Sequence, residues 1–298
     1  MDLLLCAVSL LASFAAAEEQ EYEAHTHKSR DGHTMPYRLL RPENYDKSKR
    51  YPLVLVLHGW GERGTDNKSQ LQMFGAAFLM AEAREKFPCF VLLPQTDGSW
   101  VRNPKFEKPI ALTPKPALSL QLTVDILDSL QKSERVDADR LYLTGYSNGA
   151  CGVWELLERV PRRWAAAVPM AGAGDPEHVA AAKGVAIWAF HGASDSGIPL
   201  ERMTELMSAL RSAHGAPLYT IVPNGQHYDA KVKALADPSL LPWLFAQRRG
   251  KPAVPFDKIA SASAKRPTSL DEADQSADKS KDTGKKADDK GGRSKKGK

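Results

Sequence analysis

The hydrophobic positions of this 298-residue chain gather into short unbroken runs that alternate with longer stretches of helical spacing. The clearest run, residues 51–57, is apolar throughout and contains β-branched residues, which is typical of a strand buried on both faces. Similar strands are predicted at residues 89–93, 141–144, 165–170, 185–190 and 218–222, after a short first strand at residues 34–42. Helices are predicted at residues 69–86, 117–132, 148–159, 200–213 and 238–247.

Buried strands that alternate with helices are the pattern of parallel crossover connections. The sequence therefore predicts an α/β fold with a mostly parallel central sheet and helices on both faces. No repeat of the length found in solenoids or propellers is visible. In sheets of this kind the functional groups gather at the carboxyl ends of the strands, so the candidate chemistry is sought in the loops that follow them.

The first segment of the chain, residues 3–17, is almost wholly apolar and ends in three alanines before Glu18. This form predicts a signal peptide over residues 1–17 and an exported protein, secreted or periplasmic. The run is shorter than the roughly 20 residues that a membrane-spanning helix needs, so no transmembrane segment is predicted. Asp2 stands where a signal peptide normally carries basic residues, and an N-terminal helix, disordered or packed on the core, is the alternative.

The last segment, residues 251–298, differs from the rest of the chain in composition. It holds 13 Lys or Arg and 8 Asp or Glu, so it carries the whole net charge of +5 and leaves the remainder formally neutral. Lys, Asp, Ser, Gly and Ala dominate it, which predicts a disordered tail beyond a catalytic domain of residues 18–250. Nucleic-acid binding is not expected of a neutral domain. Electrostatic attachment of the tail to an anionic surface is the alternative to a passive tail.

Two cysteines, Cys89 and Cys151, would remain after removal of the leader. They form neither a CxxC pair nor a Cys/His zinc spacing, so no metal site is expected. Both lie in apolar runs, which favours buried free thiols, and a disulfide between them is the alternative in an exported protein.

One loop combines a serine with two glycines in the run Gly145-Tyr146-Ser147-Asn148-Gly149. The predicted strand at residues 141–144 precedes it and a predicted helix follows, which is the context of a nucleophile elbow. Glycines two residues before and after the serine let strand and helix approach closely at a sharp turn. Ser147 is therefore the candidate nucleophile, and an ordinary strand-to-helix turn with this serine as helix cap is the alternative.

The partners of such a serine are expected after later strands, first an acid and then a histidine. Asp195 lies in the loop after the strand at residues 185–190, and it is the candidate acid that would orient an imidazole. His227 lies in the loop after the strand at residues 218–222, and it is the candidate general base. Turn formation before the next helix is the alternative role for Asp195, and a surface position without a function is the alternative for His227.

Stabilising an oxyanion requires two backbone N–H groups near the nucleophile. Asn148 supplies one, and Trp60 in the loop His58-Gly59-Trp60-Gly61 is the candidate for the other, whereas His58 itself is interpreted as structural. Trp100 and Tyr146 are candidates for the substrate pocket. A tryptophan packed under the long loop at residues 94–116 is the alternative for Trp100.

These signatures in combination resemble the dienelactone-hydrolase and phospholipase/carboxylesterase-like branch of the α/β-hydrolase superfamily. This branch includes bacterial proteins labelled as peptidases of the prolyl-oligopeptidase type. The resemblance runs from about residue 51 to residue 249. It is carried by the segments Leu57-His58-Gly59-Trp60-Gly61-Glu62-Arg63-Gly64, Gly145-Tyr146-Ser147-Asn148-Gly149, His191-Gly192-Ala193-Ser194-Asp195 with Ile198-Pro199, and Gly225-Gln226-His227.

The resemblance implies a carboxylic-ester hydrolase whose triad maps onto Ser147, Asp195 and His227. Many members are secreted enzymes that act on acylated plant polysaccharides or polyesters, and neither a metal nor an organic cofactor is expected. The sequence departs from many relatives at Ala150, where they carry a second glycine. It also places the bulky Trp60 in the oxyanion loop, which affects the shape of the acyl pocket.

The resulting hypothesis is a serine hydrolase that cleaves a small-molecule or polysaccharide-linked ester through an acyl-enzyme. A serine peptidase is the nearest alternative, and it is disfavoured because the region before residue 51 is too short for the propeller of the oligopeptidases. A noncatalytic binding module with the same fold is the alternative of another class.

Overall fold

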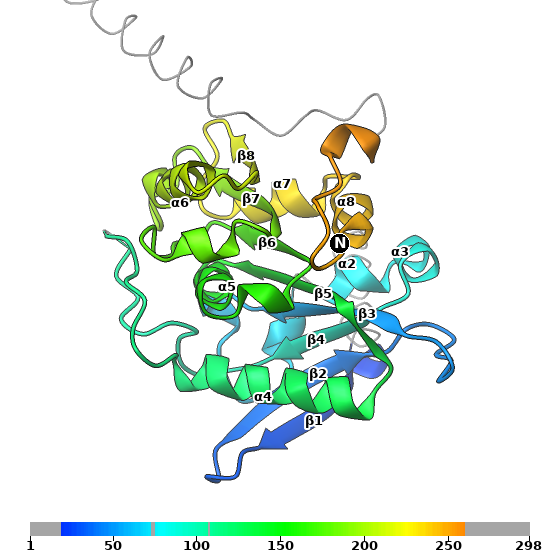
Figure 1. Cartoon of the computed structure of the whole chain (residues 1–298). Coiled ribbons are helices and arrows are strands. Elements are labelled where there is room, and N and C mark those ends of the chain that lie inside the picture. The colour runs from blue at the N-terminus through cyan, green and yellow to red at the C-terminus, as the bar shows by residue number, and fades with distance from the viewer. Residues whose placement is uncertain (1–18, 73–74, 107, 260–298) are drawn as a thin grey trace, which may run out of the picture.

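A computed structural model describes residues 19–72, 75–106 and 108–259 of the chain, and they form a central sheet between two layers of helices (Figure 1). The predicted leader at residues 1–17, and residues 260–298 of the predicted tail, lie outside the described residues. The first part of that predicted tail, residues 251–259, is ordered instead, because the buried ring of Phe256 in η5 (Phe256–Lys258) packs on Trp188. The sheet has eight strands in the order β1-β2-β4-β3-β5-β6-β7-β8. The strands are β1 (Glu23–Lys28), β2 (Thr34–Leu40), β3 (Tyr51–Leu57), β4 (Phe90–Pro94), β5 (Val136–Tyr146), β6 (Ala166–Met170), β7 (Ala186–Gly192) and β8 (Leu218–Val222).

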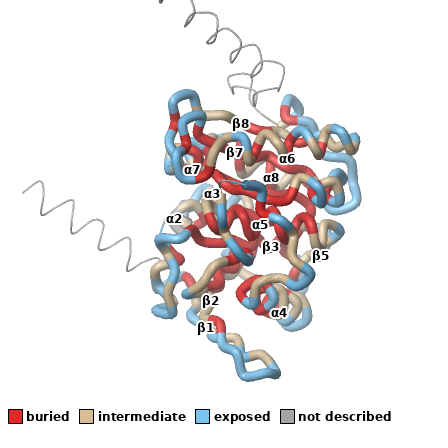
Figure 2. Tube along the Cα trace, turned by 90° about the vertical axis from the view of Figure 1, so that its left-hand side faces the viewer, coloured by how far each residue is buried: buried red, intermediate tan, exposed pale blue. Residues whose placement is uncertain are grey.

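The strands from β4 through β3 to β8 are parallel to one another, whereas β1 and β2 are antiparallel to their neighbours. The prediction of a mostly parallel sheet is confirmed. Every residue of β3, β4, β6 and β7 is buried, because helices cover both faces of these central strands. Figure 2 shows the buried residues concentrated in the sheet and on the sides of the helices that face it.

Two hydrophobic clusters fill the space between the sheet and the helices. One lies under α4 (Leu118–Ser133), α5 (Asn148–Arg159) and α6 (Leu200–Ser212), with Trp154 and Leu206 among its buried residues. The other lies under α2 (Gly75–Leu79), α7 (Asp229–Leu235) and α8 (Leu240–Ala246), with Trp188 and Trp243 at its centre. Fully burying an aliphatic or aromatic side chain of this size contributes roughly 1.5–3 kcal/mol, so these clusters supply the main stabilisation of the sheet.

The predicted helix at residues 69–86 is wrong as one element, because the structure divides it into η2 (Ser69–Leu71), α2 and α3 (Ala81–Lys86). The side chain of Asp66 accepts hydrogen bonds from the backbone N–H groups of Lys68 and Ser69, which makes a tight turn in place of a regular helix start. The backbone is extended again at Met80, between the two short helices.

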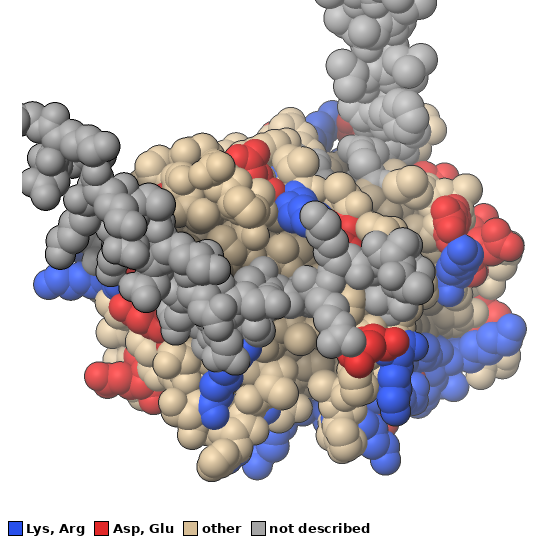
Figure 3. Space-filling model, turned by 90° about the horizontal axis from the view of Figure 1, so that it is seen from above, with Lys and Arg blue, Asp and Glu red and all other residues tan. Residues whose placement is uncertain are grey.

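Among the described residues, no helix is both long enough and apolar enough to cross a membrane. The face of the molecule seen in Figure 3 carries Lys and Arg together with Asp and Glu. The strand β5 places its carboxyl end between those of β3 and β6, so the loop after β5 lies near the middle of the sheet edge. That loop contains Ser147.

Candidate active site

Ser147 lies at the turn where β5 ends and α5 begins (Figure 1). Its φ of 57° and ψ of −124° are unusual for a residue that carries a side chain. Its backbone N–H donates a hydrogen bond of 2.9 Å to the carbonyl of Met170 at the end of β6. A conformation of this kind costs about 1–3 kcal/mol and is held by the structure around it. Strain of this size at one serine is a common feature of functional sites.

The two glycines of the turn are required by close backbone contacts. A Cβ added to Gly149 would lie 2.0 Å from the carbonyl oxygen of Leu57, because the first turn of α5 crosses the end of β3. A Cβ added to Gly145 would lie 2.7 Å from the backbone of Gly149. Real Cβ atoms do not come this close to backbone atoms, so Gly145 and Gly149 meet the steric need that the sequence motif expresses.

The side chains of Ser147, His227 and Asp195 form a continuous chain of hydrogen bonds. The Ser147 hydroxyl and His227 Nε2 are 2.7 Å apart, and His227 Nδ1 is 2.7 Å from Asp195 Oδ2. The carboxylate can only accept, so Nδ1 carries the proton and Nε2 is left to accept the hydrogen of the serine. The three residues follow β5, β8 and β7, whose parallel carboxyl ends meet at one edge of the sheet.

The carboxylate of Asp195 has no exposed side-chain surface and is surrounded by donors. The backbone N–H groups of Gly197 and Ile198 donate to its Oδ1 at 2.8 and 2.9 Å, while Oδ2 faces His227 and His191. Burial on its own raises the pKa of this group, but the hydrogen bonds from the two histidines and the backbone outweigh it and hold the pKa well below its ordinary value. Asp195 therefore remains a carboxylate that orients the imidazole.

His191 contacts the loop of Asp195 in a way that the sequence analysis did not predict. Its Nε2 donates 2.8 Å to the carbonyl of Ile198 and lies 3.3 Å from Asp195 Oδ2, so it fixes the loop that carries the acid. The side chain is completely buried. Its position at the end of β7, four residues before the acid, was visible in the sequence, but the contact with the carboxylate depends on the turn between them.

His58 has a structural role in the described site. Its Nδ1 is 2.7 Å from the carbonyl of Gly59, and its Nε2 accepts a hydrogen bond from the backbone N–H of Thr96. Burial lowers the pKa of His58 to about 4, so the ring stays neutral and keeps this pair of contacts. It joins the loop after β3 to the loop after β4.

The side chain of Asn148 anchors the first residue of α5. Its Oδ1 accepts a hydrogen bond of 2.9 Å from the backbone N–H of Trp100, and its Nδ2 donates to the hydroxyl of Ser99 at 2.8 Å. The residue is buried. The backbone N–H that follows the nucleophile is thus held in place by two contacts with the loop after β4, a support that the sequence did not reveal.

The expectation that Trp100 lines a substrate pocket is corrected by its burial. The side chain is 0% exposed, and its indole N–H donates a hydrogen bond to the carbonyl of His58. The ring packs against Gly152 of α5, where a Cβ would lie 2.8 Å from the tryptophan. A ring enclosed in this way has no face open to a ligand. Trp100 instead packs between the end of β3 and α5.

The loop that carries Trp60 lies directly beside the elbow. It forms the short helix η1 (Trp60–Glu62), and a Cβ on Gly59 would lie 3.1 Å from the ring of Tyr146. The Trp60 ring is 47% exposed and is covered by the guanidinium of Arg63 at 3.6 Å from its centroid. The half-buried Tyr146 also approaches His227, with 5.1 Å between the ring centroids. The ring of Tyr146 therefore lies beside His227, and the loop that carries Trp60 packs against this ring.

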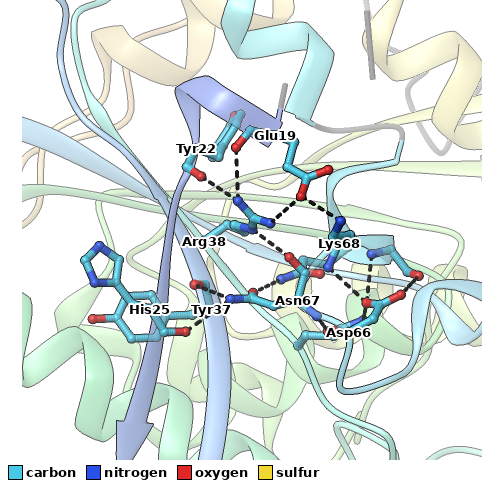
Figure 4. A network of polar contacts seen from close by, with 11 residues as sticks. Glu19, Tyr22, His25, Tyr37, Arg38, Asp66, Asn67 and Lys68 are labelled. Atoms are coloured by element: carbon cyan, nitrogen blue, oxygen red, sulfur yellow. Dashed lines mark hydrogen bonds and ion pairs between the residues drawn. The ribbon is translucent and has the colours of Figure 1, made fainter. Parts of the chain in front are cut away.

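A polar network holds the segment that follows this loop (Figure 4). The buried side chain of Arg38 donates 2.6 Å to the carbonyl of Asn67 and 2.8 Å to the carbonyl of Tyr22. Gln95, at the end of β4, donates to Asp66 and to the carbonyl of Glu62, and its Oε1 accepts from the backbone N–H of Asn67. The segment after the Trp60 loop is thus tied to β2 and β4 through the buried side chains of Arg38 and Gln95.

Cys89 and Cys151 are both free and buried, which leaves no disulfide in the described part of the chain. They belong to different clusters, Cys89 with α2 and α8 and Cys151 with the loop after β4. Burial raises the pKa of each thiol to about 12. Within the described ranges, His, Cys, Asp and Glu side chains form no group of three or more that could hold a metal ion.

No family model matches the sequence, and no curated protein matches it. Among solved structures, the chain is similar to a thermostable esterase with 31% sequence identity and a TM-score of 0.72, over 77% of this chain and 64% of that one. It thus spans about two thirds of the esterase's length.

Two further likenesses are in fold alone. A ferulic acid esterase from Anaeromyces mucronatus, solved in complex with ferulic acid, has 14% identity and a TM-score of 0.54, over 71% of this chain and 86% of that one. The acylaminoacyl peptidase of Pyrococcus horikoshii has 14% identity and a TM-score of 0.58, over 81% of this chain and 44% of that one. With the sheet order and the elbow at Ser147, these likenesses show that the chain has the α/β-hydrolase fold.

Proposed function

We propose that this protein is a serine hydrolase that cleaves carboxylic esters, with Ser147 as nucleophile, His227 as general base and Asp195 as the acid that orients the base. The observation that carries the proposal is the chain of two hydrogen bonds of 2.7 Å that joins the three side chains at a strained elbow. The 31% identity with a thermostable esterase supports the same activity.

The proposed reaction proceeds in two acyl-transfer steps. His227 Nε2 takes the proton of Ser147 as its oxygen attacks the ester carbonyl, and the imidazolium then gives this proton to the departing alcohol. Water, deprotonated by the same nitrogen, hydrolyses the acyl-enzyme and restores the serine. The backbone N–H groups of Trp60 and Asn148 are the proposed donors to the oxyanion. The mechanism uses no metal and no organic cofactor.

The proposed substrates are small-molecule or polysaccharide-linked esters. The structural likeness to a ferulic acid esterase supports this class, because that enzyme was solved with ferulic acid bound. Tyr146 is the proposed wall of the acyl site, since its half-buried ring lies against His227. Export with removal of residues 1–17, and a catalytic domain of residues 18–250, are parts of the same proposal. The mass of the protein recovered outside the cell checks the cleavage site.

A serine peptidase is the second candidate, favoured by the likeness to an acylaminoacyl peptidase. The same three residues would cleave an amide if the site protonated the leaving amine well. A panel of p-nitrophenyl and feruloyl esters, set against aminoacyl anilides, separates the two. We expect the kcat/KM for the esters to exceed that for the anilides, and the reverse order would assign the protein to the peptidases.

The substitution Ser147→Ala is the decisive test. We expect it to lower kcat on esters by roughly 10⁴-fold or more, because the acyl-enzyme can no longer form. It should leave the fold intact, since the lost hydroxyl only contacts His227. Ser208→Ala, at an exposed position of α6, is the matched control. Both variants are assayed with a fluorophosphonate probe and by thermal unfolding.

Each outcome of this test separates the hypotheses. Labelling of the wild type and of Ser208→Ala, but not of Ser147→Ala, identifies the nucleophile. A wild type that neither reacts with the probe nor turns over any substrate would indicate a noncatalytic binding module. Esterase activity retained in folded Ser147→Ala would contradict the proposal.

A further inference from the structure

A lysine is buried beside the proposed site although the triad does not need it. Lys231, on α7, is only 2% exposed. Its ammonium lies 4.4 Å from the ring centroid of Tyr146 and 4.5 Å from that of Tyr228. A cation between two aromatic faces is attracted by both rings, and more strongly when water is excluded.

The two rings belong to the residues next to the nucleophile and the base. Tyr146 precedes Ser147, and Tyr228 follows His227. The tyrosine rings meet edge to face with 6.4 Å between centroids, and the Tyr146 ring lies 5.1 Å from the ring of His227. Lys231 is therefore the centre of a cluster that joins the elbow to the loop of the base.

The third side of the cluster is the oxyanion loop. Glu62, the last residue of η1, acts on Lys231 by its negative charge and favours the charged ammonium. Its Oε2 has no hydrogen-bond partner in the part of the chain that the structure describes. The attraction between this carboxylate and the ammonium of Lys231 links α7 to the loop that carries Trp60.

The presence of a lysine here works against the stability of the fold. Burial lowers the pKa of Lys231 to about 8, which means that the folded protein disfavours the charged form although Glu62 supports it. An unbranched apolar residue would fill the same volume without this desolvation penalty. A residue kept at the expense of stability between the three loops of a site points to a role in that site.

We propose that Lys231 is a positioning residue: its ammonium holds the rings of Tyr146 and Tyr228 together, and through them keeps His227 and the Trp60 loop aligned with Ser147. The inference rests on the proposed ester hydrolysis by Ser147. It assigns a role to the charge of Lys231 and not only to its bulk, so it predicts that the alignment is lost when the amine loses its proton.

The loss of the proton from Lys231 can be distinguished from the titration of the groups around it. The charge of Glu62 on η1 acts on Lys231, and the charges of Glu62 and of Asp229 on α7 act on Tyr146. The pKa of Tyr146 is raised by burial, with smaller contributions from Asp195 and Glu62, and it remains protonated. Below about pH 8 the amine of Lys231 is charged and attracts both tyrosine rings. Above about pH 8 the amine is neutral, and this attraction is lost. The kcat of the wild type should therefore fall as the pH rises through about 8.

The test compares the wild type with Lys231→Met, Lys231→Arg and the control Lys233→Met, an exposed position on the same helix. We measure kcat and KM on a p-nitrophenyl ester between pH 6 and 9.5, corrected for spontaneous hydrolysis, with thermal unfolding of each protein. We expect Lys231→Met to lose about 10-fold in kcat at pH 7, with KM little changed, and to lack the decline near pH 8. Lys231→Arg should recover activity and stay flat to pH 9.5, because a guanidinium does not titrate there.

Stability provides a second readout. The pKa of Lys231 lies below its ordinary value of 10.5, so between pH 8 and 10.5 the unfolded chain binds a proton that the folded protein has released. The free energy of unfolding of the wild type should therefore rise with pH in this window relative to Lys231→Met. The midpoint of thermal unfolding at pH 7 shows whether Lys231→Met is folded when its kcat is compared with that of the wild type.

Several results would overturn the inference while leaving the proposed function intact. One is an active wild type whose profile stays flat through pH 8, and this measurement does not depend on any variant folding. Another is a folded Lys231→Met with the kcat and pH profile of Lys233→Met. A wild type without esterase activity or probe labelling would instead refute the proposed function itself.

Discussion

The carboxylate of Asp195 shows how one side chain can depend on an entire loop. Two backbone N–H groups and two histidines surround it, and no surface of the side chain reaches water. These donors stabilise the ionised form, so the folded protein binds a proton at this carboxyl more weakly than the unfolded chain does. The same contacts that would orient His227 also make the fold sensitive to acid.

Asp195→Asn separates these two effects. We expect kcat to fall by about 10⁴-fold, because the amide no longer selects the tautomer with a proton on His227 Nδ1. The depressed pKa of Asp195 means that its contribution to the free energy of unfolding is complete above about pH 5, begins to fall near the ordinary value of about 3.9, and is lost as the pH falls to the lower pKa of the folded state. Urea unfolding between pH 7 and 2.5 should therefore show a shallower acid loss for the variant. Equal slopes would contradict this role of Asp195.

At the scale of single residues, the sequence predicts the location of side chains in the loops that directly follow a strand. Ser147, Asp195 and His227 each follow an apolar run, and parallel strands bring the ends of such runs to one edge. His191 and Lys231 could not be predicted in this way. Lys231 belongs to a helix of seven residues that the pattern did not reveal, and its burial depends on two tyrosines that lie 85 and 3 residues away in the chain.

The elements around the elbow are held together by backbone contacts, and these contacts restrict substitution more than side-chain packing does. Gly149 on α5 touches the end of β3, and Gly145 on β5 touches Gly149 in turn. Strand, turn and helix therefore form one unit whose spacing leaves no room for a methyl group. A side chain here would push α5 away from the sheet.

Gly149→Ala is expected to destabilise the protein by about 3 kcal/mol or more, because the new Cβ would meet the backbone carbonyls of Leu57 and His58 at 2.0 and 2.6 Å. Gly184→Ala is the control, since nothing lies within 4 Å of a Cβ at that position. Chemical unfolding of both variants measures the difference. Similar midpoints for the two would show that α5 can move away from β3 without loss.

The agreement between predicted and observed elements follows the clarity of the hydrophobic pattern and of its boundaries. The helix at residues 148–159 and the strand at residues 218–222 match the structure to the residue, because each has a clear periodic pattern and a defined boundary. Strand β1 was not predicted, since its alternating polar residues at the sheet edge resemble an exposed loop. The divided helix at residues 69–86 depends on the side chain of Asp66, which a pattern of hydrophobicity does not register.

At the scale of the whole molecule, the candidate catalytic residues all lie in loops that follow strands of the sheet. None of them belongs to residues 1–17 or 260–298. Truncation after residue 259 removes 11 Lys or Arg and 7 Asp or Glu, which lowers the net positive charge by 4. We expect kcat/KM on an uncharged ester and the midpoint of thermal unfolding to remain those of the full chain. Binding to an anionic polysaccharide at low salt, if the tail has that role, should disappear. A large loss of activity would show that the tail contributes to the site.

The order of the strands separates the proposed nucleophile from its base. Ser147 follows β5, which is hydrogen-bonded to a strand on each side, whereas His227 follows β8, the outermost strand, which is bonded only to β7. Outer strands open locally at a lower free energy than the centre of a sheet. On mild heating the histidine would leave the serine while the rest of the sheet stays closed. The protein would then pass through an inactive but folded state, and activity lost in this way would return on cooling.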